Sequence, residues 1–411
     1  MLFNHYNSIS FSKNELFVDV FQNVLLFLLN PVFSICFIAF NAVKNNRKEY
    51  LLLFAIVVAL FASGINVTKI PAGDQVTYLL QFKQVRSEGF ISTLMFGSRG
   101  SMREPLYGLY VFFCNYLFLE SSKAFFFCTS FLIFLFHYLA MINIGKKYDY
   151  SNYLIISGII VLTFFSQFFS LSLHLVRQLL ATGVVFYAIS LKILNDKKYI
   201  YWMFIAFLIH STSILPAMLS FLPKISEELK SKNLLFFVSI VIIFTFSFTL
   251  VSKVFVGDSH DANVATYALS RAKDAKGLSD RADGANMDQL YINIISIPLM
   301  LISLSAYIFK RLDVSEMFIN LCICMCVFVC LVSFSPLIQY RYFFFLYSFF
   351  IFILPIAFKD GSLKSKIYCS CMSLFMVVRF FFVLPQSPFQ YADITSLLFY
   401  PFPLLFSLTA Y

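Results

Sequence analysis

Apolar runs of about 20 residues recur along the whole chain, and each is long enough to cross the ~30 Å hydrocarbon core of a bilayer. The sequence is 60% hydrophobic and only 13% charged, whereas a soluble chain of this length needs far more charge to cover its surface. The alternation of polar and apolar residues that marks a membrane β-barrel is absent. Because lipid cannot satisfy backbone polar groups, the runs predict an all-α, polytopic bundle of membrane helices.

The runs predict about twelve transmembrane helices in one membrane domain that covers residues 1–411. The expected spans are 19–43, 50–68, 105–120, 123–144, 151–170, 175–194, 199–222, 234–256, 290–309, 317–337, 341–358 and 366–384. A final apolar stretch, 394–410, contains prolines and is expected to be re-entrant or interfacial. The polar segments 69–104 and 257–289 are expected to be large loops, and loops of that length are commonly functional.

Lysine and arginine in short loops predict the orientation, because such loops stay on the cytoplasmic side. These loops are 44–48, 310–311 and 359–366. Both large loops then face outward.

Two lysine pairs contradict this orientation if every span crosses the membrane. Lys146-Lys147 and Lys197-Lys198 then lie outside, against the positive-inside rule. The conflict disappears if the short span 105–120 and the span 199–222 do not cross fully. His210-Ser211-Thr212-Ser213 interrupts the second of these spans, and a helix broken at membrane depth normally lines a cavity.

Polar residues at the edge of the predicted membrane are costly and are therefore candidates for function. Asp74 and Tyr78 are four residues apart and share a helix face, although Asp74 also suits the start of a short interfacial helix. Glu104 precedes Pro105, where a carboxylate can alternatively satisfy the amides of a helix N-terminus. Arg103 has no such structural reason, and an anionic ligand would explain a cation at that position.

Two further groups of polar residues interrupt apolar helices. His174, Arg177 and Gln178 lie on one helix face and indicate a lined cavity, with snorkelling of Arg177 to the membrane edge as the alternative. His210 lies near the middle of its span, where a satisfied core histidine is the alternative.

The last candidates open or close the C-terminal spans. Gln339 and Arg341 open the eleventh span, and Arg379 lies near the outward end of the twelfth. Arginine binds phosphate with a planar fork of donors, and interfacial anchoring is the alternative for each arginine.

Motifs for other chemistry are missing. Asp258, His260 and Asp261 match no strong metal signature, and no phosphate-binding or dinucleotide-binding glycine motif is present. The cations stand in pairs at helix ends rather than in a patch, which suits lipid headgroups and not nucleic acid. No metal, cofactor or nucleic-acid partner is therefore expected.

The order of these motifs resembles the Wzy-type O-antigen polymerases and the EpsG-like exopolysaccharide polymerases of bacterial envelopes. The resemblance covers about residues 50–360. Its motifs are, in chain order, Gly73-Asp74 with Tyr78, Arg103-Glu104-Pro105-Leu106-Tyr107, Arg177-Gln178-Leu179-Leu180-Ala181, His210-Ser211-Thr212-Ser213 and Arg341-Tyr342.

The resemblance implies a glycosyltransferase reaction at the periplasmic face of the bacterial inner membrane, in the biosynthesis of lipopolysaccharide or another polysaccharide. A growing glycan moves from undecaprenyl diphosphate to a hydroxyl on the non-reducing sugar of a new lipid-linked repeat unit. No nucleotide sugar or metal takes part. Membrane lipids surround the protein, and a separate co-polymerase is expected to regulate the chain length.

The resemblance also suggests roles for the candidate residues. The acceptor hydroxyl needs a base within hydrogen-bond reach, and the candidates are, in order, His210, Glu104 and Asp74. The diphosphate leaving group needs cations, for which the candidates are Arg103, Arg177, Arg341 and Arg379. Tyr78 and Tyr107 are expected to stack on sugar rings. The remaining substrate-binding candidates are His174, Gln178 and Gln339.

Two other functions stay open. A lipid-linked oligosaccharide flippase also needs many spans and arginines, but it usually shows two related halves, which this sequence lacks. A polyprenyl-phosphate-sugar-dependent glycosyltransferase usually carries an acidic base in its first outer loop, and Asp74 fits that position. A membrane O-acetyltransferase needs a deeper His-centred acyl site, which His210 alone supports poorly. A structural or assembly protein does not explain the costly placement of the arginines.

Overall fold

A computed structural model of the chain describes residues 13–45, 48–95, 104–222, 316–331, 336–357, 362–386, 390–392, 398 and 400–406. All regular elements in these ranges are helices, which confirms the all-α class for this part of the chain. The α-helices are α1 (Lys13–Leu29), α2 (Pro31–Asn45), α3 (Lys48–Asn66), α4 (Asp74–Met95), α5 (Pro105–Leu117), α6 (Ser122–Lys147), α7 (Asn152–Thr163), α8 (Ser166–Ser172), α9 (Val176–Ile193), α10 (Tyr199–Ile209), α11 (Ile214–Phe221), α16 (Glu316–Leu331), α17 (Pro336–Ala357) and α18 (Leu363–Val383). Short 3₁₀ helices are η2 (Ser211–Ser213), η5 (Leu384–Gln386) and η6 (Phe402–Phe406).

Several helices are suited to cross a membrane. Among the described residues, α3, α6, α9 and α18 are each long and apolar enough, and α7 and α8 together pass the same test as a pair bent by 63°. The expected spans 234–256 and 290–309 and the loop 257–289 lie outside the described residues. The protein is a multi-pass membrane protein, and the number of twelve spans stays a prediction.

Two predicted segments differ from the observed helices. The expected span 19–43 divides at Pro31, because Asn30 caps a new helix with Oδ1 accepting from the amides of Val32 and Phe33 at 3.0 and 3.1 Å. The expected loop 69–104 contains α4, which is 22 residues long. The sequence of α4 lacks the apolar run that marks a membrane helix, so sequence alone predicts a loop there.

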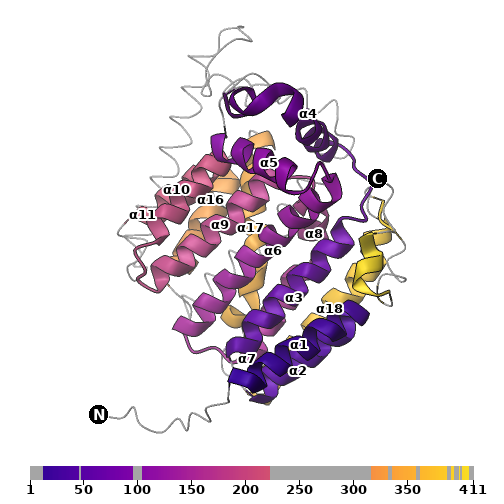
Figure 1. Ribbon diagram of the computed structural model, residues 1–411. Coiled ribbons are helices and arrows are strands. Elements are labelled where there is room, and N and C mark those ends of the chain that lie inside the picture. The colour runs from indigo at the N-terminus through magenta and orange to yellow at the C-terminus, as the bar shows by residue number, and fades with distance from the viewer. Residues whose placement is uncertain are drawn as a thin grey trace.

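The helices α4 and α5 lie across one end of the bundle, while α3, α6 and α9 run side by side along its length (Figure 1). A buried cluster joins the end of α3 to the first residues of α6 and α9 at this place, which we call the α4–α5 end. Its members include Val67, Tyr78, Tyr107, Phe125 and Val176. Because α3 ends and α6 begins in the same cluster, α5 does not cross the bundle between them.

The segment 199–222 is a re-entrant hairpin. The rings of Tyr199 and Phe221, at its two ends, lie 5.7 Å apart. The Nζ of Lys192, near the end of α9, lies 5.6 and 5.9 Å from these two rings and bonds the carbonyl of Ser220. The helices α10 and α11 therefore start and finish together, and His210 stands at the apex. The structure agrees with the expectation that 105–120 and 199–222 do not cross fully.

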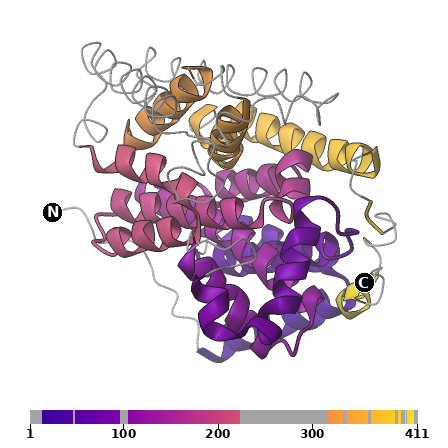
Figure 2. The same ribbon diagram turned by 90° about the horizontal axis from the view of Figure 1, so that it is seen from above.

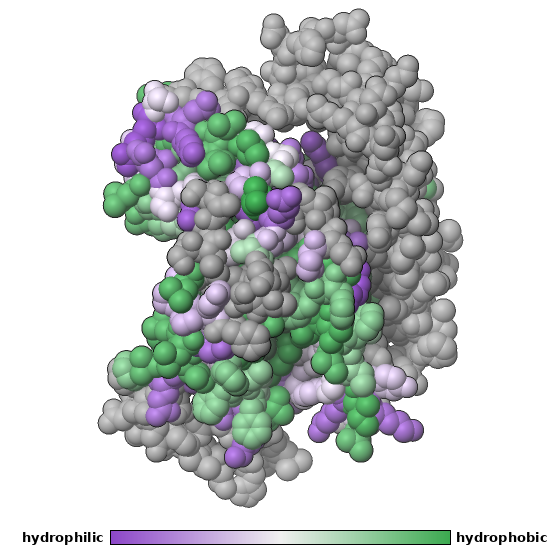
Figure 3. Space-filling view, turned by 90° about the vertical axis from the view of Figure 1, so that its right-hand side faces the viewer, coloured by the Kyte–Doolittle hydropathy of each residue, from purple (hydrophilic) through white to green (hydrophobic). Residues whose placement is uncertain are grey.

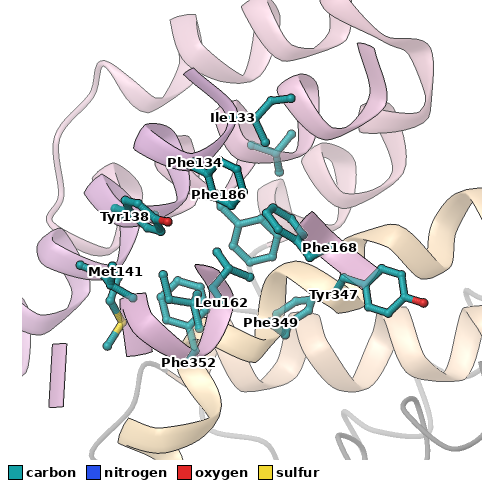
Figure 4. Close-up of a cluster of buried hydrophobic side chains, with 14 of the residues drawn as sticks. Ile133, Phe134, Tyr138, Met141, Leu162, Phe168, Phe186, Tyr347, Phe349 and Phe352 are labelled. Carbon is teal, nitrogen blue, oxygen red and sulfur yellow. The ribbon is translucent and has the colours of Figure 1, made fainter. Parts of the chain in front are cut away.

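The bundle is layered around a dense aromatic core. The orange helices α16–α18 lie on one side of the magenta helices, and the indigo and purple N-terminal helices lie on the other (Figure 2). One outer face is mainly hydrophobic along its middle, with hydrophilic residues toward its upper and lower ends (Figure 3). Between the layers, Phe134, Phe168, Phe186, Phe349 and Phe352 are fully buried or nearly so and face one another (Figure 4).

The position of α5, which does not cross the bundle, makes a topological prediction. Cysteines placed at Asp149 and Lys197 should react with a membrane-impermeant maleimide from one side, and a cysteine at Gln84 on α4 from the other. The reason is that the ends of α6 and α9 lie at the opposite end of the bundle from α4. Labelling in intact and permeabilised cells, with Cys36 and Cys371 replaced because both are exposed, tests this. Labelling of Gln84→Cys and Lys197→Cys from the same side would contradict this position of α5.

Candidate active site

Glu104 is a buried carboxylate at the start of α5. Pro105 takes the first helical position, but the Glu104 side chain makes no capping hydrogen bond, so the capping alternative is wrong. Instead, its Oε2 accepts from Nη1 of Arg177 and its Oε1 bonds Nδ1 of His210. The Glu104 side chain is 8% exposed, against 12% for His210 and 36% for Arg177.

Arg177, in the first turn of α9, is held by two tyrosines. Its guanidinium lies 5.4 Å from the centre of the Tyr78 ring and 5.8 Å from that of Tyr107. Its Nε also donates to the Tyr78 hydroxyl at 3.4 Å. The two rings pack edge to face at 6.1 Å and are buried, so a sugar could stack on them only if the pair opened.

His210 reaches Glu104 because the hairpin breaks there. The residue is extended, with φ −156° and ψ 128°, between α10 and η2. Its carbonyl accepts from the amide and the hydroxyl of Ser213 at 3.1 and 2.8 Å, which fixes the turn. Among the described residues, Nε2 of His210 has no hydrogen-bond partner, so this nitrogen is available to a ligand.

The partners Arg177 and His210 decide the protonation state of Glu104. Burial by itself raises the pKa of a carboxyl group, but the charges and hydrogen bonds of His210 and Arg177 outweigh burial and lower the pKa of Glu104 to about 2. Glu104 is therefore an anion at neutral pH with both oxygens already bound. It is poorly suited to accept a proton from a substrate.

His174 and Asp74 lie beside this cluster without joining it. Gly73 turns the chain before α4 with φ +55°, and a Cβ there would come within 2.5 Å of the His174 ring. Asp74 is exposed in the first turn of α4, as its structural alternative predicts. The close contact between Gly73 and the His174 ring fixes the start of α4, the helix that carries Tyr78. Burial, and then the charge of Lys69, lowers the pKa of His174.

The remaining predicted residues are spread over three places. Gln178 is buried and its Nε2 bonds the carbonyl of Arg341, which places the start of α17 beside Arg177. Gln339 is also buried and donates to the carbonyl of Val329 at 3.1 Å. Arg379 donates to the hydroxyl of Ser166 at 3.2 Å, on the broken pair α7–α8. Arg103 lies outside the described residues.

Lys69 is a buried cation that the sequence interpretation missed. It is 0% exposed, and its Nζ donates to the carbonyl of Ser170 at 2.9 Å. The last turn of α8, which ends at Ser172, leaves carbonyls that need donors, and Lys69 supplies one. Burial lowers its pKa to about 7. The signal in the sequence is a lone lysine directly after an apolar run, at the first position of the expected loop 69–104.

No group of three or more His, Cys, Asp and Glu side chains able to hold a metal ion occurs within the described residues. The possible metal ligands Asp258, His260 and Asp261 lie outside the described ranges.

Comparison with protein families gives one match. The EpsG family matches residues 49–402, which is most of the chain. The chain belongs to the EpsG family. Members of this family are membrane proteins associated with polysaccharide polymerisation by glycosyltransferase-like activity. Comparison with curated proteins and with solved structures gives no significant match.

The EpsG match includes the Glu104 cluster and every predicted site residue. The cluster joins residues 104, 177 and 210, which are far apart in the sequence within the matched range. It offers a fixed anion, a partly exposed guanidinium and an imidazole nitrogen available to a ligand. That combination suits proton removal from a bound hydroxyl next to a site for a polar ligand.

The ion pair makes a stability prediction. Glu104→Gln should lower the free energy of unfolding at pH 7 by about 1–3 kcal/mol, because it leaves Arg177 without its anion. A carboxyl group whose pKa is lowered stabilises the fold above its unfolded value of 4.5 and loses that effect toward 2. The difference between the two proteins should therefore shrink as pH falls from 4.5 toward 2. Thermal unfolding in detergent measures it, and a difference that grows on acidification would contradict the pairing.

Proposed function

We propose that the protein is a polysaccharide polymerase of the bacterial inner membrane. It transfers a growing glycan from undecaprenyl diphosphate to the non-reducing sugar of a new undecaprenyl-diphosphate-linked repeat unit, at the periplasmic face. The acceptor oxygen forms a bond to the anomeric carbon while the bond from that carbon to the diphosphate breaks. Membership of the EpsG family and the buried Glu104–Arg177–His210 cluster at the α4–α5 end support this proposal.

His210 is the base in this scheme. A proton on Nδ1 satisfies Glu104, which leaves the lone pair of Nε2 to accept the proton of the acceptor hydroxyl. Glu104 orients the imidazole and stabilises the imidazolium that forms, as the carboxylate does in other His–carboxylate pairs. Asp74 is a weaker candidate, because it is exposed and has no recorded contact with the cluster in the described structure.

The leaving group needs positive charge. Arg177 supplies donors, but Glu104 already balances its charge. Arg341 is the best-placed second cation, because its carbonyl is bonded by Gln178, the residue next to Arg177. Arg103 and Arg379 stay candidates for the same role. Membrane lipids and a co-polymerase that sets chain length are the proposed partners.

A deletion strain tests the reaction itself. Envelope polysaccharide from the strain should show single repeat units on a gel, and the restored gene should return a ladder. Loss of all repeat units, with lipid-linked units trapped on the cytoplasmic side, would indicate a flippase instead.

His210→Asn tests the base. The amide of asparagine can still donate to Glu104 as Nδ1 does, but no side-chain base remains. We expect normal folding with a loss of polymerisation of at least about 100-fold. Thermal unfolding and the ladder assay separate the two effects. A ladder of normal length from His210→Asn would remove His210 from the mechanism and direct attention to Asp74, the base of a polyprenyl-phosphate-sugar-dependent glycosyltransferase.

The arginines provide a further test. Arg177→Ala and Arg341→Ala should abolish the ladder at normal expression, and Arg177→Lys should restore it only in part, because lysine lacks the planar fork. Arg86→Ala is the control, since Arg86 pairs at 2.8 Å with Glu120 at an exposed site. A full ladder from both alanine variants would exclude these arginines.

A further inference from the structure

Tyr107 carries a buried hydroxyl that has no hydrogen-bond partner among the described residues. The side chain is 2% exposed and lies within the Glu104 cluster, with its ring under the guanidinium of Arg177. A hydroxyl removed from water without a partner destabilises a protein. Within the described structure, no hydrogen bond explains why a tyrosine rather than a phenylalanine occupies this position.

Neighbouring tyrosines show that the fold can satisfy such groups. Tyr110, one turn further along α5, shares a hydrogen bond of 2.7 Å with the hydroxyl of Thr129. Tyr138 on α6 shares one of 2.6 Å with Thr163. Tyr78 accepts from Arg177. Tyr107 differs from these three tyrosines and lies at the cluster that contains the proposed base.

A second buried hydroxyl group lies two residues after His210 in the sequence. Thr212, in η2, is 7% exposed, and its Oγ1 also has no partner in the described part of the chain. Its neighbour Ser213 bonds the carbonyl of His210. Tyr107 and the turn that contains Thr212 are therefore linked through Glu104, which precedes α5 and bonds His210.

The local charge favours a neutral ligand. Glu104 and Arg177 cancel each other as a pair, so this pair offers no excess positive charge for a phosphate. A sugar hydroxyl, which donates and accepts at once, matches a tyrosine hydroxyl in such a place. Arg177 is the most exposed of the three side chains in the cluster, so a ligand that moves it reaches Tyr107.

We propose that the Tyr107 hydroxyl, together with that of Thr212, hydrogen-bonds the acceptor sugar beside the hydroxyl that His210 deprotonates. This inference rests on the proposed function and names its acceptor specificity: a sugar that presents a hydroxyl there, not a deoxy or alkylated carbon. A site whose buried polar groups are paired by the substrate discriminates strongly against analogues that leave them unpaired.

Tyr107→Phe and Tyr110→Phe form a matched pair of variants. Tyr107→Phe removes a hydroxyl without a partner and keeps the ring against Arg177, so its melting temperature should be unchanged or higher. Tyr110→Phe breaks the bond to Thr129 and should melt lower, by about 2 °C. Initial rates of polymerisation should fall at least about fivefold in Tyr107→Phe, the value of one hydrogen bond, and stay near wild type in Tyr110→Phe. Thr212→Val should behave like Tyr107→Phe.

The binding step can be measured with the lipid-linked repeat unit extracted from the deletion strain. This unit should raise the melting temperature of the wild type more than that of Tyr107→Phe, whereas undecaprenyl diphosphate without sugar should raise both equally. Full activity of Tyr107→Phe, a melting temperature lowered as in Tyr110→Phe, or an equal deficit with both lipids would each overturn the inference. Failure of the wild-type gene to restore the ladder would instead reject the polymerase function.

Discussion

The α4–α5 end depends on one buried carboxylate. An anion that is 8% exposed is tolerated only when cations or donors occupy its oxygens, and Glu104 has one partner on each. Those partners come from α9 and from the apex of the α10–α11 hairpin, so a single side chain joins three segments that are far apart in sequence. The same contacts that stabilise the anion give His210 its orientation and Arg177 its position over two tyrosines. Both the packing of the α4–α5 end and the proposed chemistry therefore depend on the contacts of Glu104.

The broken helices follow from the same requirement. A membrane helix satisfies its own backbone, but a break at His210 or the end of a short helix such as α8 exposes carbonyls that need donors. Ser213 returns to the carbonyl of His210, and Lys69 donates to that of Ser170. These local solutions make it possible for polar residues to enter an apolar bundle at defined places. The hairpin can then present an imidazole at its apex while its two ends stay together at Lys192.

The sequence predicted the all-α class and the apolar helices α3, α6, α9 and α18, because a run of apolar residues is a strong and local signal. The same signal, counted together with the lysine pairs, indicated that 105–120 and 199–222 do not cross. It failed at α4, whose polar surface hides a helix, and at Asn30-Pro31, where capping divides an apolar run. The grouping of Glu104, Arg177 and His210 was not predicted. Each residue was a candidate, but contacts over 73 and 106 positions leave no periodic trace in a single sequence.

The ion pair between Glu104 and Arg177 also changes the catalytic roles that the residue types suggest. Taken singly, Glu104 is a possible base and Arg177 a phosphate ligand. In the ion pair, each residue limits the chemistry of the other. The carboxylate is held anionic with its oxygens occupied, and the charge of the guanidinium is balanced. Proton transfer then passes to His210, and stabilisation of a departing diphosphate calls for a second cation. The backbone carbonyl of Arg341 is bonded by Gln178, the neighbour of Arg177, so Arg341 is positioned to supply that charge. In the proposed reaction, proton transfer then takes place at the junction of α10 and η2, and leaving-group stabilisation at α17.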